Sequence, residues 1–178
     1  MLEQASIASG QRQRVAIART LAVEPVVLLA DEPTSMLDVS IRIGILNLML
    51  KLKEEHRIAF LYVTHDLAAA RYVADDMLVM YAGQIVEQGP VEEVLAAPLH
   101  PYTRLLLEAA PDPANTTRAT HMERLPGRGS AAIEPVEGCR FLPRCPLAVA
   151  VCSEITPQLV APQPGHAARC HVTAPPPD

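Results

Sequence analysis

Aromatic residues are scarce in this sequence and tryptophan is absent, so a hydrophobic core has to be built from Leu, Val, Ile and Ala. No apolar run approaches the roughly 18 residues that a membrane-spanning helix needs. The first residues lack a basic segment followed by an apolar stretch, so we expect no signal peptide and a cytoplasmic location. The net charge of −5 offers no general excess of positive charge, which disfavours binding to nucleic acid.

Apolar residues make up 49% of the 178 residues, enough for one domain with a core and an appendage. Proline divides the chain, because five of the 17 prolines lie in residues 1–110 and twelve in residues 111–178, together with all four cysteines. We therefore predict a regular α/β segment at residues 1–110, an extended linker at residues 111–135 and a small cysteine-containing appendage at residues 136–178.

Hydrophobic periodicity predicts alternating strands and helices along the first segment. Two short apolar runs, Val26–Ala30 and Ile58–Thr64, are typical of parallel strands that are covered on both faces. A helical pattern at Val39–Glu55 connects them, with Asp38 as its candidate N-cap, so the three elements form a βαβ unit. The other predicted elements are helices at Gln11–Ala22 and Leu67–Ala74, a hairpin at Met77–Gly89 turning at Ala82-Gly83, and closing helices at residues 92–97 and 101–110.

Acidic and imidazole side chains follow the two predicted strands. Asp31 and Glu32 come directly after the first apolar run, and His65 follows the second. Because parallel neighbours end at the same edge of a sheet, where α/β proteins bind ligands, these side chains should converge. They suit nucleotide hydrolysis: Asp31 would hold Mg²⁺ directly or through water, Glu32 would activate the attacking water, and His65 would contact the γ-phosphate. The alternative, an acidic pair that only begins a solvated turn, is disfavoured by the apolar run before it.

Three segments between Ser9 and Ala110 carry the motifs of one known family. VVLLADEPTSMLD has the form of a Walker B strand with its catalytic glutamate, followed by a D-loop at Ser35–Asp38. YVTHDLAAARYVADDMLVMYAGQIVEQGP has the form of a switch-histidine segment, and SGQRQRVAIARTLAVEP that of a signature helix. Together they resemble the ATP-binding subunits of ABC transporters. The resemblance implies an α/β fold, the C-terminal part of an ABC-type P-loop NTPase sheet with flanking helices, and ATP with Mg²⁺ as its ligand.

The tail of the chain adds a second resemblance. HPYTRLLLEAAP, then LPG and GCRFLPRC, resembles the C-terminal region of the oligopeptide/dipeptide branch of these transporters. This implies import of peptides or of another small solute, such as nickel. It also implies three partners: a second ATP-binding subunit in a dimer, transmembrane permease subunits and, indirectly, a solute-binding protein. The chain would then be peripheral on the inner face of the plasma membrane.

The start of the signature helix suits an anion, because a helix N-terminus presents free backbone N–H groups to phosphate. In the family this helix caps the γ-phosphate of ATP held by the opposite subunit. The resemblance thus implies that Ser9, Gly10, Gln11 and Asp38 contact nucleotide. The family's Leu-Ser-Gly-Gly-Gln is altered here, however. Read without a gap, Ala8 takes the position of the phosphate-facing hydroxyl; read with one glycine lost, only SGQ remains. Either alignment predicts weakened phosphate binding.

A phosphate loop of the form GxxxxGK[ST] is absent, because none of the eight glycines is followed by lysine. The family's Q-loop and helical subdomain, which precede the signature, are absent too. No segment would then cradle the β-phosphate, so we predict that this polypeptide alone does not hydrolyse ATP. The missing neighbours would also leave apolar strand edges and faces open. A truncated or frameshifted gene that starts inside the domain would explain both features.

Four cysteines, Cys139, Cys145, Cys152 and Cys170, stand at C-x5-C-x6-C-x17-C spacing in the C-terminal segment. A reducing cytoplasm disfavours disulfides, and zinc sites usually contain a closer pair. Four thiolates can hold an iron–sulfur cluster at less uniform spacing, and reduced structural thiols are the remaining alternative. Because the similar tail of the family carries the same kind of cysteine pattern, we place a [4Fe–4S] cluster ahead of zinc, and metal binding slightly ahead of structural thiols.

Three functional hypotheses follow from these observations. The first is an ATPase subunit, or its C-terminal half, that energises solute import, which the motifs between Asp31 and His65 favour. The second is a non-enzymatic fragment that docks on a full-length partner, which the missing phosphate loop favours. The third is a redox or metal-binding module on an α/β scaffold, which the four cysteines favour.

Overall fold

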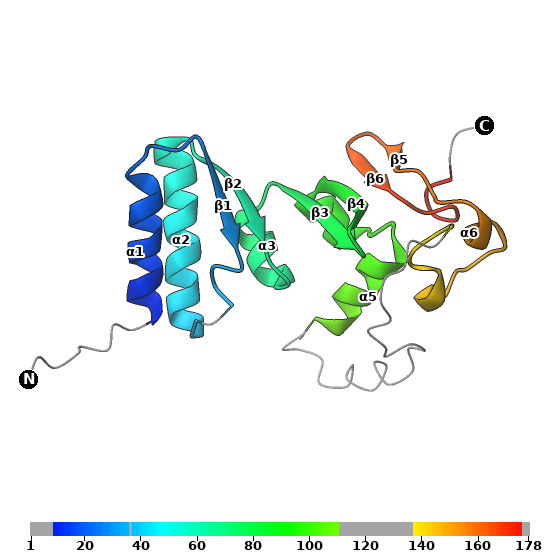
Figure 1. Cartoon of the computed structure of the whole chain (residues 1–178), viewed down its shortest axis with the longest axis horizontal. Coiled ribbons are helices and arrows are strands. Elements are labelled where there is room, and N and C mark those ends of the chain that lie inside the picture. The colour runs from blue at the N-terminus through cyan, green and yellow to red at the C-terminus, as the bar shows by residue number, and fades with distance from the viewer. Residues whose placement is uncertain (1–8, 36, 111–136, 176–178) are drawn as a thin grey trace, which may run out of the picture. The chain divides into compact units, whose positions relative to one another are not determined.

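The computed structural model describes residues 9–35, 37–110 and 137–175. The chain divides into two compact units, Met1–Ala74 and Asp75–Asp178. Each unit has its own sheet, of two strands in the first and of four strands in the second (Figure 1). The linker predicted at residues 111–135 lies outside the described residues, and the predicted domain boundaries stay a prediction.

The first unit is a βαβ motif with one helix before it and one after it. Strands β1 and β2 are parallel and in register from Val27–Ala59 to Asp31–Val63, and the long helix α2 connects them. The elements are α1 (Ser9–Leu21), β1 (Val27–Asp31), α2 (Val39–His56), β2 (Ala59–Val63) and α3 (Leu67–Val73). Their order and type confirm the sequence prediction, and the differences at their ends are of the size usual for helix and strand boundaries.

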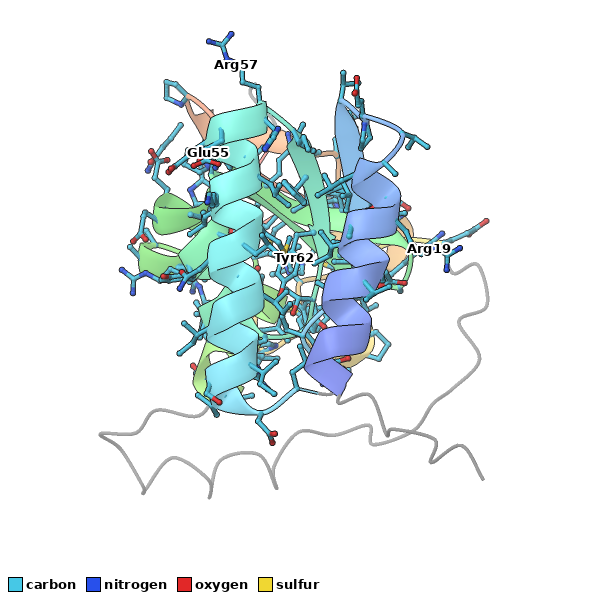
Figure 2. The ribbon with its side chains drawn as sticks, turned by 90° about the vertical axis from the view of Figure 1, so that its left-hand side faces the viewer. Arg19, Glu55, Arg57 and Tyr62 are labelled. Carbon is cyan, nitrogen blue, oxygen red and sulfur yellow. The ribbon has the colours of Figure 1, made fainter. Side chains whose placement is uncertain are left out.

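One face of the two-stranded sheet packs against α1 and α2. Figure 2 shows these two helices side by side, with Tyr62 of β2 between them. Ile45 and Met49 of α2 are buried, as the helical spacing predicted, and each contributes roughly 1.5–3 kcal/mol by leaving water. The core consists of Ala30, Leu37, Ile45 and Met49, with Ile17, Leu28, Ile41, Phe60 and Tyr62 packed against it.

The opposite face of this sheet is left open by the described residues. Its large side chains are Val27, Leu29, Leu61 and Val63, which are 61%, 66%, 54% and 46% exposed. The expectation from the apolar runs that both strands are covered on both faces is therefore wrong, whereas the expectation that missing neighbours leave an apolar face open is confirmed for the described residues. Because side chains alternate along a strand and both helices pack on the same side, every second residue points away from the core.

The second unit contains an antiparallel sheet with the strand order β3-β4-β6-β5. Strands β3 and β4 form the predicted hairpin, whose turn residues Ala82 and Gly83 have φ values of 50° and 77°. Two consecutive positive φ angles are what a tight two-residue hairpin turn needs. The elements are β3 (Asp76–Tyr81), β4 (Gln84–Pro90), α4 (Val91–Ala96), α5 (Pro101–Ala109), η3 (Leu142–Arg144), α6 (Val151–Glu154), β5 (Val160–Gln163) and β6 (His166–Ala168).

Strand β6 joins the cysteine-containing segment to the hairpin. Glu87 of β4 pairs with Ala168, and Gln88 pairs with Ala167. The two segments are about 80 positions apart in sequence, yet they share one sheet. The sequence analysis did not predict this pairing, because a strand as short as β6 carries no periodic signal.

Ring side chains fill the space beside this sheet. Phe141 is 1% exposed and lies 5.1 Å from Tyr81, 5.7 Å from Tyr102 and 5.3 Å from His100, measured between ring centroids. His100 also caps α5, because its Nδ1 accepts a hydrogen bond from the Tyr102 amide at 3.0 Å. Pro101 at the first helical position favours the same helix start. Within the described ranges, no helix is long and apolar enough to cross a membrane.

Candidate functional site

Strands β1 and β2 end at the same edge of the first sheet. Asp31 pairs with Val63 at the last position of their parallel register. The Glu32 amide continues the ladder by donating to the Val63 carbonyl at 2.9 Å. Glu32 and His65, which follow the two strands, therefore leave the sheet close together, as the sequence analysis predicted.

Glu32 has an uncommon backbone conformation. Its φ of 43° lies in the left-handed region that residues other than glycine seldom adopt. The Ser35 amide and the Ser35 hydroxyl donate to the Glu32 carbonyl at 3.3 and 3.0 Å, which closes a tight turn directly after β1. Such a conformation costs on the order of 1–3 kcal/mol and is found most often at functional sites. The turn keeps the Glu32 carboxylate at the edge of the sheet.

The Glu32 carboxylate meets the imidazole of His65. Nδ1–H of His65 donates to Oε1 of Glu32 at 2.9 Å, since an ionised carboxylate can only accept. The side chains of His65 and Glu32 are 74% and 47% exposed, so the pair contributes at most about 1 kcal/mol. A ligand that reaches this edge can therefore exchange the mutual contact for its own contacts at little cost.

Asp31 supplies a second carboxylate next to Glu32, and its side chain is exposed. Adjacent carboxylates at a solvent-facing edge present the oxygen ligands that Mg²⁺ takes together with water, so the donor set fits a hydrated magnesium ion. Behind the acidic pair, Thr34 is 3% exposed and shares a hydrogen bond of 3.1 Å with the Tyr62 hydroxyl. This buried contact ties the loop after β1 to the core, and the sequence analysis did not anticipate it.

The neighbour of His65, Asp66, orients the loop after β2. Its carboxylate caps α3 by accepting from the amides of Ala68 and Ala69 at 3.0 and 3.1 Å, and it pairs with Arg42 of α2 at 2.8 Å. The sequence analysis gave no role to Asp66 or Arg42. An aspartate directly before a helical apolar run is an N-cap signal that could have been recognised. The Arg42 partner had no such signal, because it lies 24 positions away.

The predicted nucleotide contacts outside this edge, at Ser9, Gly10, Gln11 and Asp38, stay a prediction. Helix α1 begins at Ser9, so Ser9, Gly10 and Gln11 form its first turn, but their side chains lie outside the described part of the chain. Asp38 occupies the N-cap position of α2, yet its carboxylate makes no capping hydrogen bond. The separate prediction that the Asp38 side chain caps α2 is wrong, because this side chain is exposed and only the Asp38 carbonyl, which accepts from the Arg42 amide at 2.8 Å, takes part in the helix start.

The four cysteines lie in the second unit as free thiols. Burial raises the pKa of Cys139, and the nearby Cys152 and Cys170 raise it further. Burial also raises the pKa of Cys145, with smaller contributions from the other three thiols. Among the residues that the structure describes, however, no three His, Cys, Asp or Glu side chains are placed to hold a metal ion as they stand.

Buried hydrogen bonds of Glu87 with Leu99, His100 and His166 connect β4, β6 and the start of α5. We call this group the polar node; it was not predicted from the sequence. Glu87 is 0% exposed; its Oε1 accepts from the Leu99 amide and from His166 Nε2, both at 2.7 Å, and its Oε2 accepts from the His100 amide at 2.8 Å. Burial lowers the pKa of His100 to about 4, against a smaller opposing effect of Glu87. His100 therefore stays neutral, which lets its Nδ1 accept from the Tyr102 amide.

Two family models match parts of the chain. The family model described as ABC transporter matches residues 2–35, and the one described as Oligopeptide/dipeptide transporter, C-terminal region, matches residues 86–152. The chain is 45% identical over 169 residues to the "Probable peptide ABC transporter ATP-binding protein y4tS" of Sinorhizobium fredii, covering 95% of this chain and 48% of that protein. It is 46% identical over 154 residues to the "Di/tripeptide transport ATP-binding protein DppF" of Pseudomonas aeruginosa, covering 84% of this chain and 46% of that protein.

A solved structure is similar as well: the post-hydrolysis dimer of the ATP-binding cassette MJ0796 with ADP and Pi, at 36% identity and a TM-score of 0.45, over 50% of this chain and 38% of that chain. The sequence relationships define the class: the chain belongs to the ATP-binding proteins of ABC transporters. Within that family it carries the C-terminal region of the oligopeptide/dipeptide branch. The chain spans about half the length of the curated relatives it matches.

Proposed function

We propose that this chain supplies the C-terminal part of an ATP-binding subunit that energises the import of peptides or similar small solutes. The carrying observation is the 2.9 Å contact between Glu32 and His65 at the edge where β1 and β2 end. The names of the relatives, which are peptide and di/tripeptide ABC transporter ATP-binding proteins, support the solute class. Nickel and other small solutes are the alternatives to peptides.

In this proposal the edge residues divide the work of hydrolysis. Glu32 orients a water molecule and accepts its proton, which its exposed carboxylate can do once the weak contact with His65 is exchanged. His65 then contacts the γ-phosphate, and Asp31 holds magnesium directly or through water. The magnesium ion, when bound, screens the negative charge of the phosphates. The left-handed turn at Glu32 keeps its carboxylate beside the imidazole before any ligand arrives.

The proposal extends to the partners of the subunit. Ser9, Gly10, Gln11 and Asp38 face ATP held by a second ATP-binding subunit, and their place at the N-terminus of a helix, for the first three, supports an anion there. Permease subunits receive the resulting motion, and a solute-binding protein delivers the cargo to them. The chain works at the cytoplasmic side of the plasma membrane, and nucleic acid is not among its ligands.

A hybrid protein tests the proposal. The part of the Sinorhizobium fredii relative that precedes the segment aligned with this chain is fused to residue 1, and Mg-ATP hydrolysis is measured. We expect turnover, and Glu32→Gln should lower kcat by about 100-fold or more while nucleotide binding is kept, because the general base is lost. Glu55→Gln, an exposed substitution on α2, is the matched control and should leave kcat unchanged. A folded hybrid that binds ATP and keeps its activity after Glu32→Gln would refute the assignment.

We further propose that the cysteines hold a [4Fe–4S] cluster, with zinc as the alternative metal. All four cysteines lie in the second unit as free thiols, and the Cys139 amide donates to the Cys152 carbonyl at 2.8 Å, which supports this. Binding would have to draw the thiolates around the cluster from their present positions. Anaerobic purification, a visible absorption spectrum and metal analysis test it. Colourless protein without iron or zinc would leave the cysteines as structural thiols.

A further inference from the structure

The two loops that carry Glu32 and His65 are joined at two places. The first is the end of the sheet, where the Glu32 amide donates to the Val63 carbonyl at 2.9 Å. The second lies beyond both site residues, where Nη1 of Arg42 on α2 donates to Oδ2 of Asp66 at 2.8 Å. Because the loop after β1 leads into α2, and Asp66 directly follows His65, this ion pair closes the far side of the site.

Asp66 is also fixed within its own loop. Its Oδ1 accepts from the amides of Ala68 and Ala69 at 3.0 and 3.1 Å, and its own amide donates to the Thr64 hydroxyl at 3.0 Å. The other carboxylate oxygen, Oδ2, is left for the contact with α2, and an ionised carboxylate can accept all of these bonds at once. The backbone of His65, between Thr64 and Asp66, therefore follows the position in which α2 holds the Asp66 carboxylate.

The ion pair is not arranged for the greatest stability. The side chains of Arg42 and Asp66 are 33% and 28% exposed, so water screens part of their attraction. Nε of Arg42 is buried and has no hydrogen-bond partner among the residues that the structure describes. A buried donor without a partner offsets part of what the pair contributes to folding. The position that the pair gives to the loop explains its presence better than its stabilising effect does.

Helices α2 and α3 share a second polar contact, which provides a matched comparison. The Tyr72 hydroxyl of α3 donates to Oδ1 of Asn47 on α2 at 2.7 Å. This contact lies more than one helical turn farther along each helix than Arg42 and Asp66 do. It joins the same two helices without touching either loop of the site.

We propose that Arg42 is a positioning residue for His65: through the Asp66 carboxylate, it holds the imidazole beside Glu32. The inference rests on the proposed function for one point only, that Glu32 and His65 act on ATP. A displacement of about 1 Å near reacting groups can cost on the order of 100-fold in rate, so losing one of the two places that join the loops should lower turnover clearly.

Imidazole NMR of the whole 178-residue chain, without nucleotide, tests the placement. At alkaline pH the ring ¹⁵N shifts of His65 give the ratio of its Nδ1–H and Nε2–H forms, which depends on the hydrogen bond to Glu32. Arg42→Met keeps the apolar stem but removes the donors, and it should lower this ratio by about threefold, within the roughly fivefold that so exposed a contact can supply. Arg42→Lys can still make the single contact and should restore the ratio, whereas Tyr72→Phe is the matched control and should not change it.

The hybrid protein with the preceding part of the Sinorhizobium fredii relative tests the consequence for hydrolysis. Arg42→Met should lower kcat about tenfold and leave KM for Mg-ATP within about twofold, because the loop position matters to the reacting groups more than to nucleotide binding. Arg42→Lys should regain most of kcat. Tyr72→Phe removes the other contact between the helices and should leave both constants within about twofold. Circular dichroism of each variant shows that it is folded.

The inference is overturned by an Arg42→Met chain with an unchanged tautomer ratio, by an equal effect of Tyr72→Phe, or by a loss that Arg42→Lys does not restore. An active hybrid that keeps its kcat after Arg42→Met overturns it as well. A folded hybrid that hydrolyses no ATP, while the tautomer ratio of the chain responds to Arg42→Met as expected, would refute the proposed function alone.

Discussion

Replacing Glu87 by glutamine tests the account of the buried polar node. Both carboxylate oxygens accept N–H groups, Oε1 from Leu99 and His166 and Oε2 from His100. A glutamine of the same shape has only one oxygen, so its amide NH₂ must face an N–H donor. One buried donor is then left unpaired, which costs about 1–3 kcal/mol, and the two remaining bonds lose their charge assistance, at about 1 kcal/mol each. Relief from burying a charge offsets part of this, so we expect a net loss of about 3 kcal/mol.

Thermal unfolding together with hydrogen exchange measures the effect of Glu87→Gln. A loss of about 3 kcal/mol lowers the Tm of a unit of this size by roughly 10–20 °C. Faster exchange should be concentrated in β4, β6 and the first turn of α5, because these are the elements that the node connects. Glu93→Gln is the matched control, since Glu93 is exposed on α4 and its change should stay within about 0.5 kcal/mol. If Glu87→Gln proves as stable as Glu93→Gln, the reasoning from buried hydrogen bonds is wrong.

Three further predictions follow from other parts of the chain. The pKa of His100 is about 4 in the folded chain and 6.5 when unperturbed, as in the unfolded chain. As the pH falls, the unfolded chain therefore takes up the proton first. The free energy of unfolding is highest above pH 6.5 and decreases by about 3 kcal/mol towards pH 4. Urea unfolding at pH 7 and pH 4 measures this loss, and His100→Asn, which can still cap α5, should abolish it; an unchanged pH dependence would exclude His100 as its source. Gly138→Ala should cost about 3 kcal/mol, because φ is +91° and the new Cβ would lie 2.5 Å from the Cys152 carbonyl oxygen, whereas Gly165→Ala, at φ +82° with open space around it, should cost about 1 kcal/mol. Equal Tm losses for the two glycines would contradict this account. The 178-residue polypeptide without a complementary segment should show no Mg-ATP hydrolysis above background in a phosphate-release assay, and turnover that Glu32→Gln abolishes would contradict that.

The βαβ unit, and the sheet edge at which Glu32 and His65 follow its two strands, could be predicted because their sequence signals are local. Two apolar runs and one helical repeat identify the strands and the crossover helix. Parallel pairing then requires that Glu32 and His65 emerge at the same edge, and the 2.9 Å contact between them agrees with this. The hairpin turn at Ala82-Gly83 is local in the same sense, since it depends on two neighbouring backbone conformations.

Other expectations failed or were missing because they depend on packing. Apolar strands indicate burial, but the side on which α1 and α2 pack left Leu29 and Leu61 exposed. The N-cap signal at Asp38 was correct in position, yet its side chain turns to solvent instead of capping α2. The pairing of β6 with β4 and the role of Glu87 left no trace in the sequence pattern, because a single glutamate in a strand has the same pattern whether it is solvated or buried.

The sequence by itself determined the family and the order of the elements, because these depend on periodicity, on turn residues and on motifs that are contiguous in the chain. Only the tertiary structure decided which distant groups meet: Arg42 with Asp66, and Glu87 with His166. The physical reason is that such contacts arise when the core brings together segments far apart in sequence, and their energy depends on the burial that results.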